Sequence, residues 1–452
     1  MFDTLSTTLR DIRPVAHCGR VSGVARGVIS VTGLTHVARL GDRLRIDRGT
    51  AGPLEAEVLK LGADTIAALP EGATEGIALG QDCVHLGARG IAPQDGWIGR
   101  IIDPFGRPLD GRPLFPGPQP RPLRAPPPDP VRRGRLGARL ATGMAVFDTL
   151  LPLVTGQRMG LFAGSGVGKS LLLARLARAM ESDVVVMALI GERGRELREF
   201  VDDTLGPEGL ARTVIVAAPS DRSPLERRRC AWAAMSVAEH FRDQGRQVLL
   251  LADSITRFAE AHREVALAAG EPASLRGHPP SIAHEIMALA ERAGPGADGA
   301  GAITALFTVL VAGSDMEEPV ADILRGVLDG HTVMDRAIAE RGRFPAIDVL
   351  RSVSRSLPAA ATPEENARIA EARRLLGAYD RAELMIQSGL YEPGSDPLVD
   401  RAVQLWPELD AFVGREAPGG ILQSFAMLAR ILDTPSARPG AARGPGGAEA
   451  NG

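Results

Sequence analysis

The stretch Gly160-Leu161-Phe162-Ala163-Gly164-Ser165-Gly166-Val167-Gly168-Lys169-Ser170 decides the fold class of this chain. The apolar residues from Met159 to Phe162 predict a buried strand, and the apolar run from Leu171 to Met180 predicts a helix. A loop with three glycines lies between them. This order of strand, glycine-rich loop and helix is typical of a P-loop, in which backbone N–H groups bind phosphate oxygens.

The last two residues of the stretch carry side chains suited to a bound nucleotide. Lys169 would place a positive charge on the outer phosphates, and the Ser170 hydroxyl would hold Mg²⁺. Ala163 replaces the first glycine of the strict motif, and we expect so small a residue to be tolerated. The chain has 52 Lys and Arg residues, of which the lysines are Lys60 and Lys169. Arginine therefore occupies almost every basic position, but the loop has a lysine. A glycine-rich turn without a ligand is the alternative.

The composition is that of a soluble globular protein with two or three domains. The chain has 452 residues, of which 44% are hydrophobic and 24% charged, and its net charge is -3. This balance does not drive the whole chain onto nucleic acid or an anionic membrane. Cys18, Cys83 and Cys230 lack the spacing of metal ligands. No apolar run is long enough to span a bilayer, and no signal peptide is evident, so we expect a cytoplasmic protein.

The N-terminal part of the sequence predicts a short helix followed by a β-domain. Residues 1–18 carry Phe2, Leu5, Leu9 and Ile12 at helical spacing. They form either a docking segment for a partner or membrane surface, or a helix that packs on the protein's own core. Between residues 19 and 92, turn signals recur about every ten residues, which predicts a small β-barrel or sandwich.

The rest of the sequence predicts an α/β domain and an all-α domain. Residues 93–357 begin with a proline-rich connector at 113–130 and then alternate strand and helix signals, which favours a mostly parallel sheet. Residues 358–434 have helical patterning that starts at the capping residue Thr362. Residues 435–452 are rich in Gly, Pro and Ala and predict a disordered tail.

Two carboxylates follow buried strands of the predicted α/β domain. Asp253 ends the apolar run Val248 to Ala252, which suits a Mg²⁺-supporting Walker-B residue. Glu192 comes shortly after the run Val184 to Ile190 and could polarise an attacking water molecule. Either acid alone is more often a turn residue, but together with a P-loop they favour nucleotide hydrolysis.

These motifs together resemble the rotary ATP synthase catalytic-subunit superfamily, and the resemblance covers nearly the whole chain. Within that superfamily the chain most resembles the ATPase of type III protein export, and the flagellum-specific form more than the virulence-secretion form. The motifs that carry the resemblance are the loop 163–170, Gly191-Glu192-Arg193-Gly194-Arg195-Glu196, Asp253-Ser254-Ile255-Thr256-Arg257-Phe258-Ala259, Leu267-Ala268-Ala269-Gly270-Glu271-Pro272, Asp329-Gly330-His331, Pro345-Ala346-Ile347-Asp348 and Ser352-Val353-Ser354-Arg355.

The resemblance implies a role for each matching residue. Glu192 and Lys169 would be catalytic, and Arg355 would be an arginine finger that acts in trans on the neighbouring subunit's nucleotide. Ser170 and Asp253 would support Mg²⁺. The nucleotide-binding residues implied are Ala163, Gly164, Ser165, Gly166, Val167, Gly168, Lys169, Ser170, Arg193, Arg257 and Phe344.

Some of these roles have structural alternatives. Phe344 stands where the family places an aromatic ring against adenine, but it could be an ordinary core residue. Phe412 is the nearest candidate for a second adenine-stacking ring. Arg193 and Arg257 match arginines near the phosphates, but each could belong to a structural ion pair.

The resemblance also implies an architecture and an activity. We expect an N-terminal β-barrel, a central RecA-like P-loop NTPase domain and a C-terminal all-α domain. A homo-hexamer would hydrolyse ATP with Mg²⁺ and energise flagellar protein export at the inner face of the cytoplasmic membrane. Expected partners are a stator-like regulator at the N-terminal helix, membrane proteins of the export gate, and chaperone–substrate complexes, but not nucleic acid.

Four other functions remain open from the sequence. Two are enzymes: a virulence type III secretion ATPase, or the catalytic subunit of a rotary proton-translocating ATP synthase. A non-catalytic ring subunit is disfavoured by Glu192, because such subunits have Gln at that position. A nucleic-acid translocase is disfavoured by the acidic balance and by the aromatic content of 4%.

Overall fold

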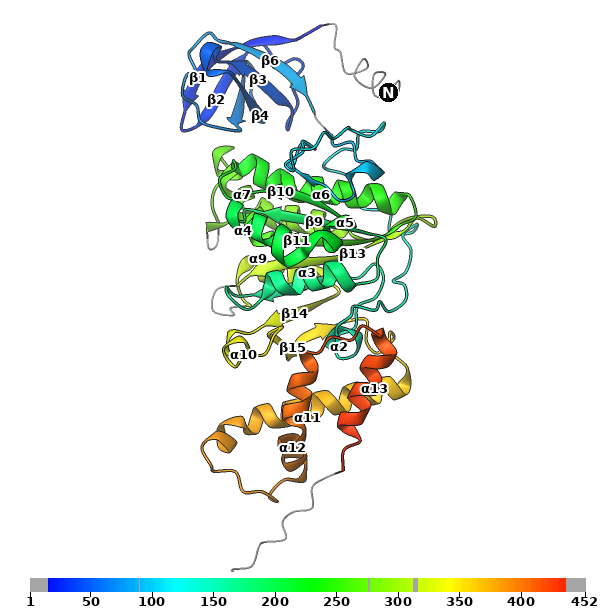
Figure 1. Cartoon of the computed structure of the whole chain (residues 1–452). Helices are drawn as coiled ribbons and strands as arrows, with labels where there is room; N and C mark the ends of the chain where they lie inside the picture. The colour runs from blue at the N-terminus through cyan, green and yellow to red at the C-terminus, as the bar shows by residue number, and fades with distance from the viewer. Residues whose placement is uncertain (1–14, 89, 275–276, 312–315, 436–452) are drawn as a thin grey trace, which may run out of the picture.

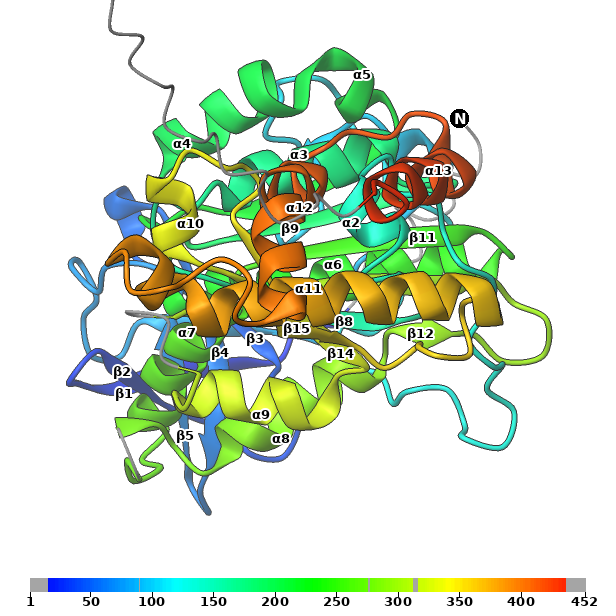
Figure 2. The same cartoon turned by 90° about the horizontal axis from the view of Figure 1, so that it is seen from below.

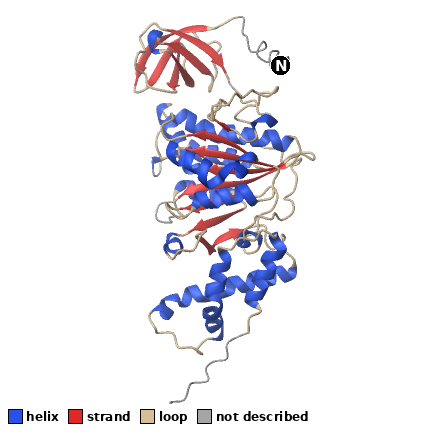
Figure 3. Ribbon diagram, viewed as in Figure 1, coloured by secondary structure: helices blue, strands red, loops and turns tan. Residues whose placement is uncertain are grey.

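The computed structural model describes residues 15–88, 90–274, 277–311 and 316–435, and within them it contains a barrel, a central sheet and a helical domain (Figures 1 and 3). The N-terminal helix expected within residues 1–18 therefore falls mostly outside the described residues. So does nearly all of the tail predicted to be disordered. Both remain predictions.

The N-terminal domain is a closed antiparallel barrel, as predicted. Among the residues described, neighbouring strands follow the order β1-β2-β5-β4-β3-β6. Side chains alternate along the strands, so that Ile29, Val31 and Leu44 lie in the barrel interior. The strands are β1 (Cys18–Ala25), β2 (Val28–Thr32), β3 (Arg43–Asp47), β4 (Pro53–Leu61), β5 (Thr65–Pro70) and β6 (Asp82–Gly87).

The central domain is built on a mostly parallel sheet, which was also predicted. Over the described ranges the strand order is β15-β14-β8-β13-β11-β9-β10-β7, with β12 paired to β13. The pairs β14–β15 and β12–β13 are antiparallel, and the others are parallel. The strands are β7 (Ile101–Ile102), β8 (Arg158–Ala163), β9 (Val184–Ile190), β10 (Thr213–Ala218), β11 (Gln247–Asp253), β12 (Gly294–Pro295), β13 (Ala302–Leu310), β14 (Gly330–Met334) and β15 (Ile347–Ser354).

Helices cover both faces of this sheet, which explains why its strands are continuously apolar (Figure 1). In β9, Val185 and Met187 face a core that includes α3, whereas Val184 and Val186 face a core that includes α6, α7, α8 and α9. The helices are α2 (Ala145–Asp148), α3 (Lys169–Ala179), α4 (Gly194–Glu199), a π-helical turn (Phe200–Leu205), α5 (Gly206–Ala211), α6 (Pro224–Asp243), α7 (Ile255–Ala268), α8 (Ser281–Glu291), α9 (Pro319–Val327) and α10 (Arg336–Glu340).

The C-terminal domain consists of α11 (Pro363–Gln387), α12 (Pro397–Val413) and α13 (Gly420–Leu432). The predicted start of α11 is confirmed, because Thr362 and Glu365 form a reciprocal capping box. The view from below shows these helices lying across the end of the central domain near β14 and β15 (Figure 2).

The proline-rich segment 113–130, all of which is described, contains no helix and runs along the central domain. It is held by its carbonyl groups: the Arg292 guanidinium donates to the Leu123 carbonyl at 2.6 Å, and the Ser236 hydroxyl donates to the Pro122 carbonyl at 3.1 Å. No helix in the described part of the chain is both long and apolar enough to cross a membrane.

Candidate active site

The glycine-rich loop lies at the carboxyl end of β8, a strand between β13 and β14. The loop leads directly into α3, so the positive end of the helix dipole adjoins the loop. Gly168 has a φ of 84°, and a Cβ added there would lie 3.0 Å from the ring of Phe344. This position favours glycine, because the backbone is left-handed and any Cβ would crowd the ring.

A cavity of about 690 Å³ opens beside the loop and brings together most of the residues predicted for nucleotide binding. Its position at the carboxyl edge of a parallel sheet is the usual place for a ligand in such folds. The lining residues are Ala163, Gly164, Ser165, Gly166, Gly168, Lys169, Ser170, Leu171, Gly191, Glu192, Arg193, Glu196, Thr256, Arg257, Glu260, Leu310, Val311 and Glu318.

Lys169 is paired with both predicted carboxylates. Its ammonium donates to Asp253 Oδ1 and lies 3.6 Å from Glu192 Oε1. Asp253 is only 3% exposed and also accepts a hydrogen bond of 2.7 Å from the Thr308 hydroxyl. Burial raises the pKa of Glu192, against the lowering effect of Lys169, and Asp253 raises it further. A cation and two carboxylates that are far apart in the sequence thus meet at one point.

The two arginines expected near the phosphates both line the cavity and are both in ion pairs. Arg193 donates to Glu196 Oε1 at 3.0 Å, and Arg257 donates to Glu260 Oε2 at 2.8 Å. Arg257 also packs its aliphatic carbons against Gly191, where an added Cβ would meet them at 3.2 Å. No partner was predicted for either arginine from the sequence, although each glutamate stands three residues after its arginine.

The two aromatic candidates occupy opposite environments. Phe344 is 40% exposed and lies against the glycine-rich loop at Gly168, so it is not an ordinary core residue. Phe412 is 0% exposed and lies in the core under the C-terminal helices, so the structure excludes it as a stacking surface. The reason is amphipathic spacing: Leu405, Leu409 and Phe412 lie on one buried face of α12.

Arg355 lies far from its own chain's cavity. Its N–H donates to the Asp329 carbonyl, and the preceding Ser354 pairs with Gly330. The next residue of β14, His331, pairs with Gly160 near the start of β8, whereas the loop follows the end of β8. By this register, Arg355 lies level with the start of β8, about five residues before the loop. At ~3.3 Å per residue this is a backbone separation of roughly 16 Å along the strands, which exceeds the length of an arginine side chain.

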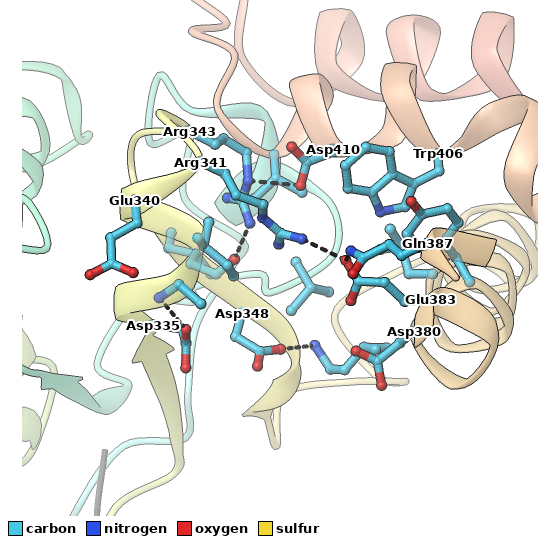
Figure 4. A pocket seen from close by; sticks show the side chains of 18 of the residues that line it. Asp335, Glu340, Arg341, Arg343, Asp348, Asp380, Glu383, Gln387, Trp406 and Asp410 are labelled. Carbon is cyan, nitrogen blue, oxygen red and sulfur yellow. Dashed lines mark hydrogen bonds and ion pairs between the residues drawn. The ribbon is translucent and has the colours of Figure 1, made fainter. Parts of the chain in front are cut away.

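A second hollow of about 640 Å³ lies between the central and C-terminal domains (Figure 4). Its wall includes Tyr379 and Trp406, whose rings stack 4.5 Å apart. The Arg341 guanidinium lies over the Trp406 ring, and its Nη1 donates a hydrogen bond of 3.0 Å to Glu383 Oε1. Because it contains none of the residues predicted for nucleotide binding, we assign the chemistry to the cavity beside the glycine-rich loop.

Two family models match this chain in adjoining regions. Residues 143–354 match the ATP synthase alpha/beta family, nucleotide-binding domain. Residues 361–416 match the type III secretion EscN ATPase C-terminal domain. The first match contains the whole cavity, and the second lies in the C-terminal helices.

Known proteins resemble the chain over nearly its full length. The flagellum-specific ATP synthase of Caulobacter vibrioides is 47% identical over 95% of this chain and 99% of its own. That of Salmonella typhimurium is 42% identical over 91% of this chain and 92% of its own. The type 3 secretion system ATPase of Pseudomonas syringae pv. tomato is 43% identical over 92% and 93%.

A solved structure agrees with these sequence relations. The assembled ATPase EscN from the type III secretion system of enteropathogenic E. coli superposes with a TM-score of 0.83 at 36% identity, covering 92% of this chain and all of that chain. The chain therefore belongs to the ATP synthase alpha/beta family, in the branch that contains the flagellum-specific ATP synthases and the type 3 secretion system ATPases, and it is an ATPase.

Proposed function

We propose that this chain hydrolyses MgATP to energise the export of flagellar proteins. The observation that carries the proposal is the meeting of Lys169, Glu192 and Asp253 beside a phosphate-binding loop. A loop alone would only bind nucleotide, whereas the added carboxylates can act on water and on a metal ion. The flagellum-specific relatives favour flagellar export over virulence secretion.

Residues for the phosphates and Mg²⁺ are in suitable places. Lys169 would exchange its carboxylate partners for the outer phosphate oxygens. Ser170 lines the cavity, and the buried Asp253 carboxylate is paired with Lys169, which also lines it. The site thus offers the hard oxygen donors that Mg²⁺ prefers. When bound, Mg²⁺ would neutralise charge on the phosphoryl oxygens.

Glu192 is the group that would act on the attacking water. Its Oε1 lies 3.6 Å from Lys169 Nζ and it lines the cavity, so it can accept a proton from a water molecule bound there. Its raised pKa makes it a better proton acceptor than an ordinary exposed carboxylate. Phe344 would stack on adenine.

Arg355 would complete the site of a neighbouring subunit. The strand register sets it at the end of the sheet opposite its own chain's loop, which supports a role in trans. We therefore propose a homo-hexameric ring. The solved relative EscN is described as assembled, and also as a complex with its central stalk EscO. A stalk protein is a reasonable further partner of this chain.

The remaining partners are proposed from the family. They are a stator-like regulator at the N-terminal helix, membrane proteins of the export gate, and chaperone–substrate complexes. We place the ring in the cytoplasm, at the inner face of the membrane.

Two experiments test the proposal. The purified chain should hydrolyse ATP only with Mg²⁺, and RNA should not stimulate it. Deletion of the gene should give cells without flagella, and a plasmid copy should restore them. A deletion strain with normal flagella would refute the flagellar role, and a purified chain that binds no ATP would refute the activity itself.

A further inference from the structure

Among the described residues, each cation that lines the cavity beside the glycine-rich loop is paired with a carboxylate. Lys169 has Asp253 and Glu192, which the proposed mechanism already uses. The two arginines have partners that it does not use: Arg193 pairs with Glu196, and Arg257 pairs with Glu260. Both of these glutamates line the cavity as well.

We infer that Glu196 and Glu260 are positioning residues that orient the two arginines and give them up to the phosphates when nucleotide binds. The inference rests on the proposed function, in which the cavity lined by Arg193 and Arg257 holds the phosphates of the nucleotide. It adds that nucleotide affinity is set by an exchange of partners, from carboxylate to phosphate.

The geometry of the Arg257 pair supports an exchange. Arg257 bonds Glu260 through Nη1 only, and its buried Nε has no acceptor among the described residues. A phosphate oxygen that displaces Glu260 therefore competes with a single hydrogen bond, the one from Nη1. The aliphatic part of Arg257 rests against Gly191, the residue before Glu192, and both residues line the same cavity.

The strength of the pairs also suits an exchange. The side chains of Arg193 and Glu196 are 79% and 49% exposed, and those of Arg257 and Glu260 are 42% and 36% exposed. Partly exposed pairs three residues apart on a helix are weak. A multiply charged phosphate group is a stronger partner for a guanidinium than one solvated carboxylate. The glutamates thus orient the arginines but bind them weakly enough for a phosphate group to displace them.

The test compares nucleotide affinity in isosteric variants. Glu260→Gln and Glu196→Gln each remove one negative charge and keep the shape of the side chain. Each should lower the Kd for MgADP and the KM for MgATP by about two- to fivefold, with no rise in kcat, because an arginine is released to the phosphates. Thermal melting should stay at the parent value.

Two neighbouring pairs provide matched controls. Arg195–Glu199 and Arg227–Glu264 have similar lengths of 2.8 and 2.9 Å, but neither pair lines the cavity. Glu199→Gln and Glu264→Gln should leave the Kd unchanged, since neither changes a cation that reaches the phosphates.

A double-mutant cycle separates exchange from simple repulsion. In an Arg257→Ala background, Glu260→Gln should no longer tighten MgADP binding, because no arginine is left to release. Equal tightening with and without Arg257 would overturn the inference, as would an unchanged or weaker affinity in Glu260→Gln alone. A parent chain that binds no nucleotide would instead refute the proposed function.

Discussion

The placement of Arg355 predicts that each active site combines the glycine-rich loop of one subunit with Arg355 of its neighbour. Replacing it by alanine removes a side chain whose backbone lies roughly 16 Å from its own chain's loop, as estimated from the strand register at ~3.3 Å per residue. The Kd for ATP should therefore stay close to the parent value. Turnover should fall by ~10³–10⁵, the usual contribution of an arginine finger in phosphoryl transfer.

Mixing two inactive variants tests whether the finger acts in trans. Arg355→Ala keeps an intact loop, and Lys169→Ala keeps an intact finger. In a ring assembled randomly from equal amounts, about one quarter of the interfaces pair an intact Lys169 with an intact Arg355 of the neighbour. The mixture should therefore recover up to about one quarter of the parent turnover.

Steady-state phosphate release, measured before and after subunit exchange, gives the result. Exchange itself is followed separately with two fluorescent labels. Each variant alone should remain inactive at every protein concentration, while parent activity should rise steeply as rings assemble. If labelled subunits exchange and turnover stays at the background, the in-trans role of Arg355 is wrong.

Three further outcomes are expected. Glu192→Gln should still bind MgATP but hydrolyse it at least ~100-fold more slowly. Glu192 must be ionised to accept a proton, and its pKa is raised, so parent activity should fall as the pH drops through that raised pKa. The residual activity of Glu192→Gln should not show this loss. Phe412→Ala should lower the free energy of unfolding by about 3–5 kcal/mol without changing the Kd for ATP, whereas Phe344→Ala should weaken ATP binding and leave the melting temperature nearly unchanged. Removal of residues 1–13 should preserve melting and basal turnover but abolish regulator binding; aggregation or early melting would favour a core role for that segment.

The glycine-rich loop and the carboxylates were predictable from sequence because their signals are local. A strand, three glycines and a helix specify the loop within about 20 residues, and an acid just after a buried strand lies at the carboxyl edge of any parallel sheet. The predictions of a barrel, a mostly parallel sheet and C-terminal helices also rest on local periodicity and capping, as at Thr362. The residue roles themselves remain proposals.

Tertiary structure alone decided which side chains meet and which are hidden. Phe412 was a plausible ring for adenine until the packing of α12 placed it in the core, because burial depends on what covers a helix face. The distance of Arg355 from its own loop follows from the antiparallel pairing of β15 with β14, a long-range contact that no local pattern encodes. The Glu260 pair needed an observed side-chain geometry, since a glutamate three residues after an arginine can bond it, bond a neighbour or face solvent.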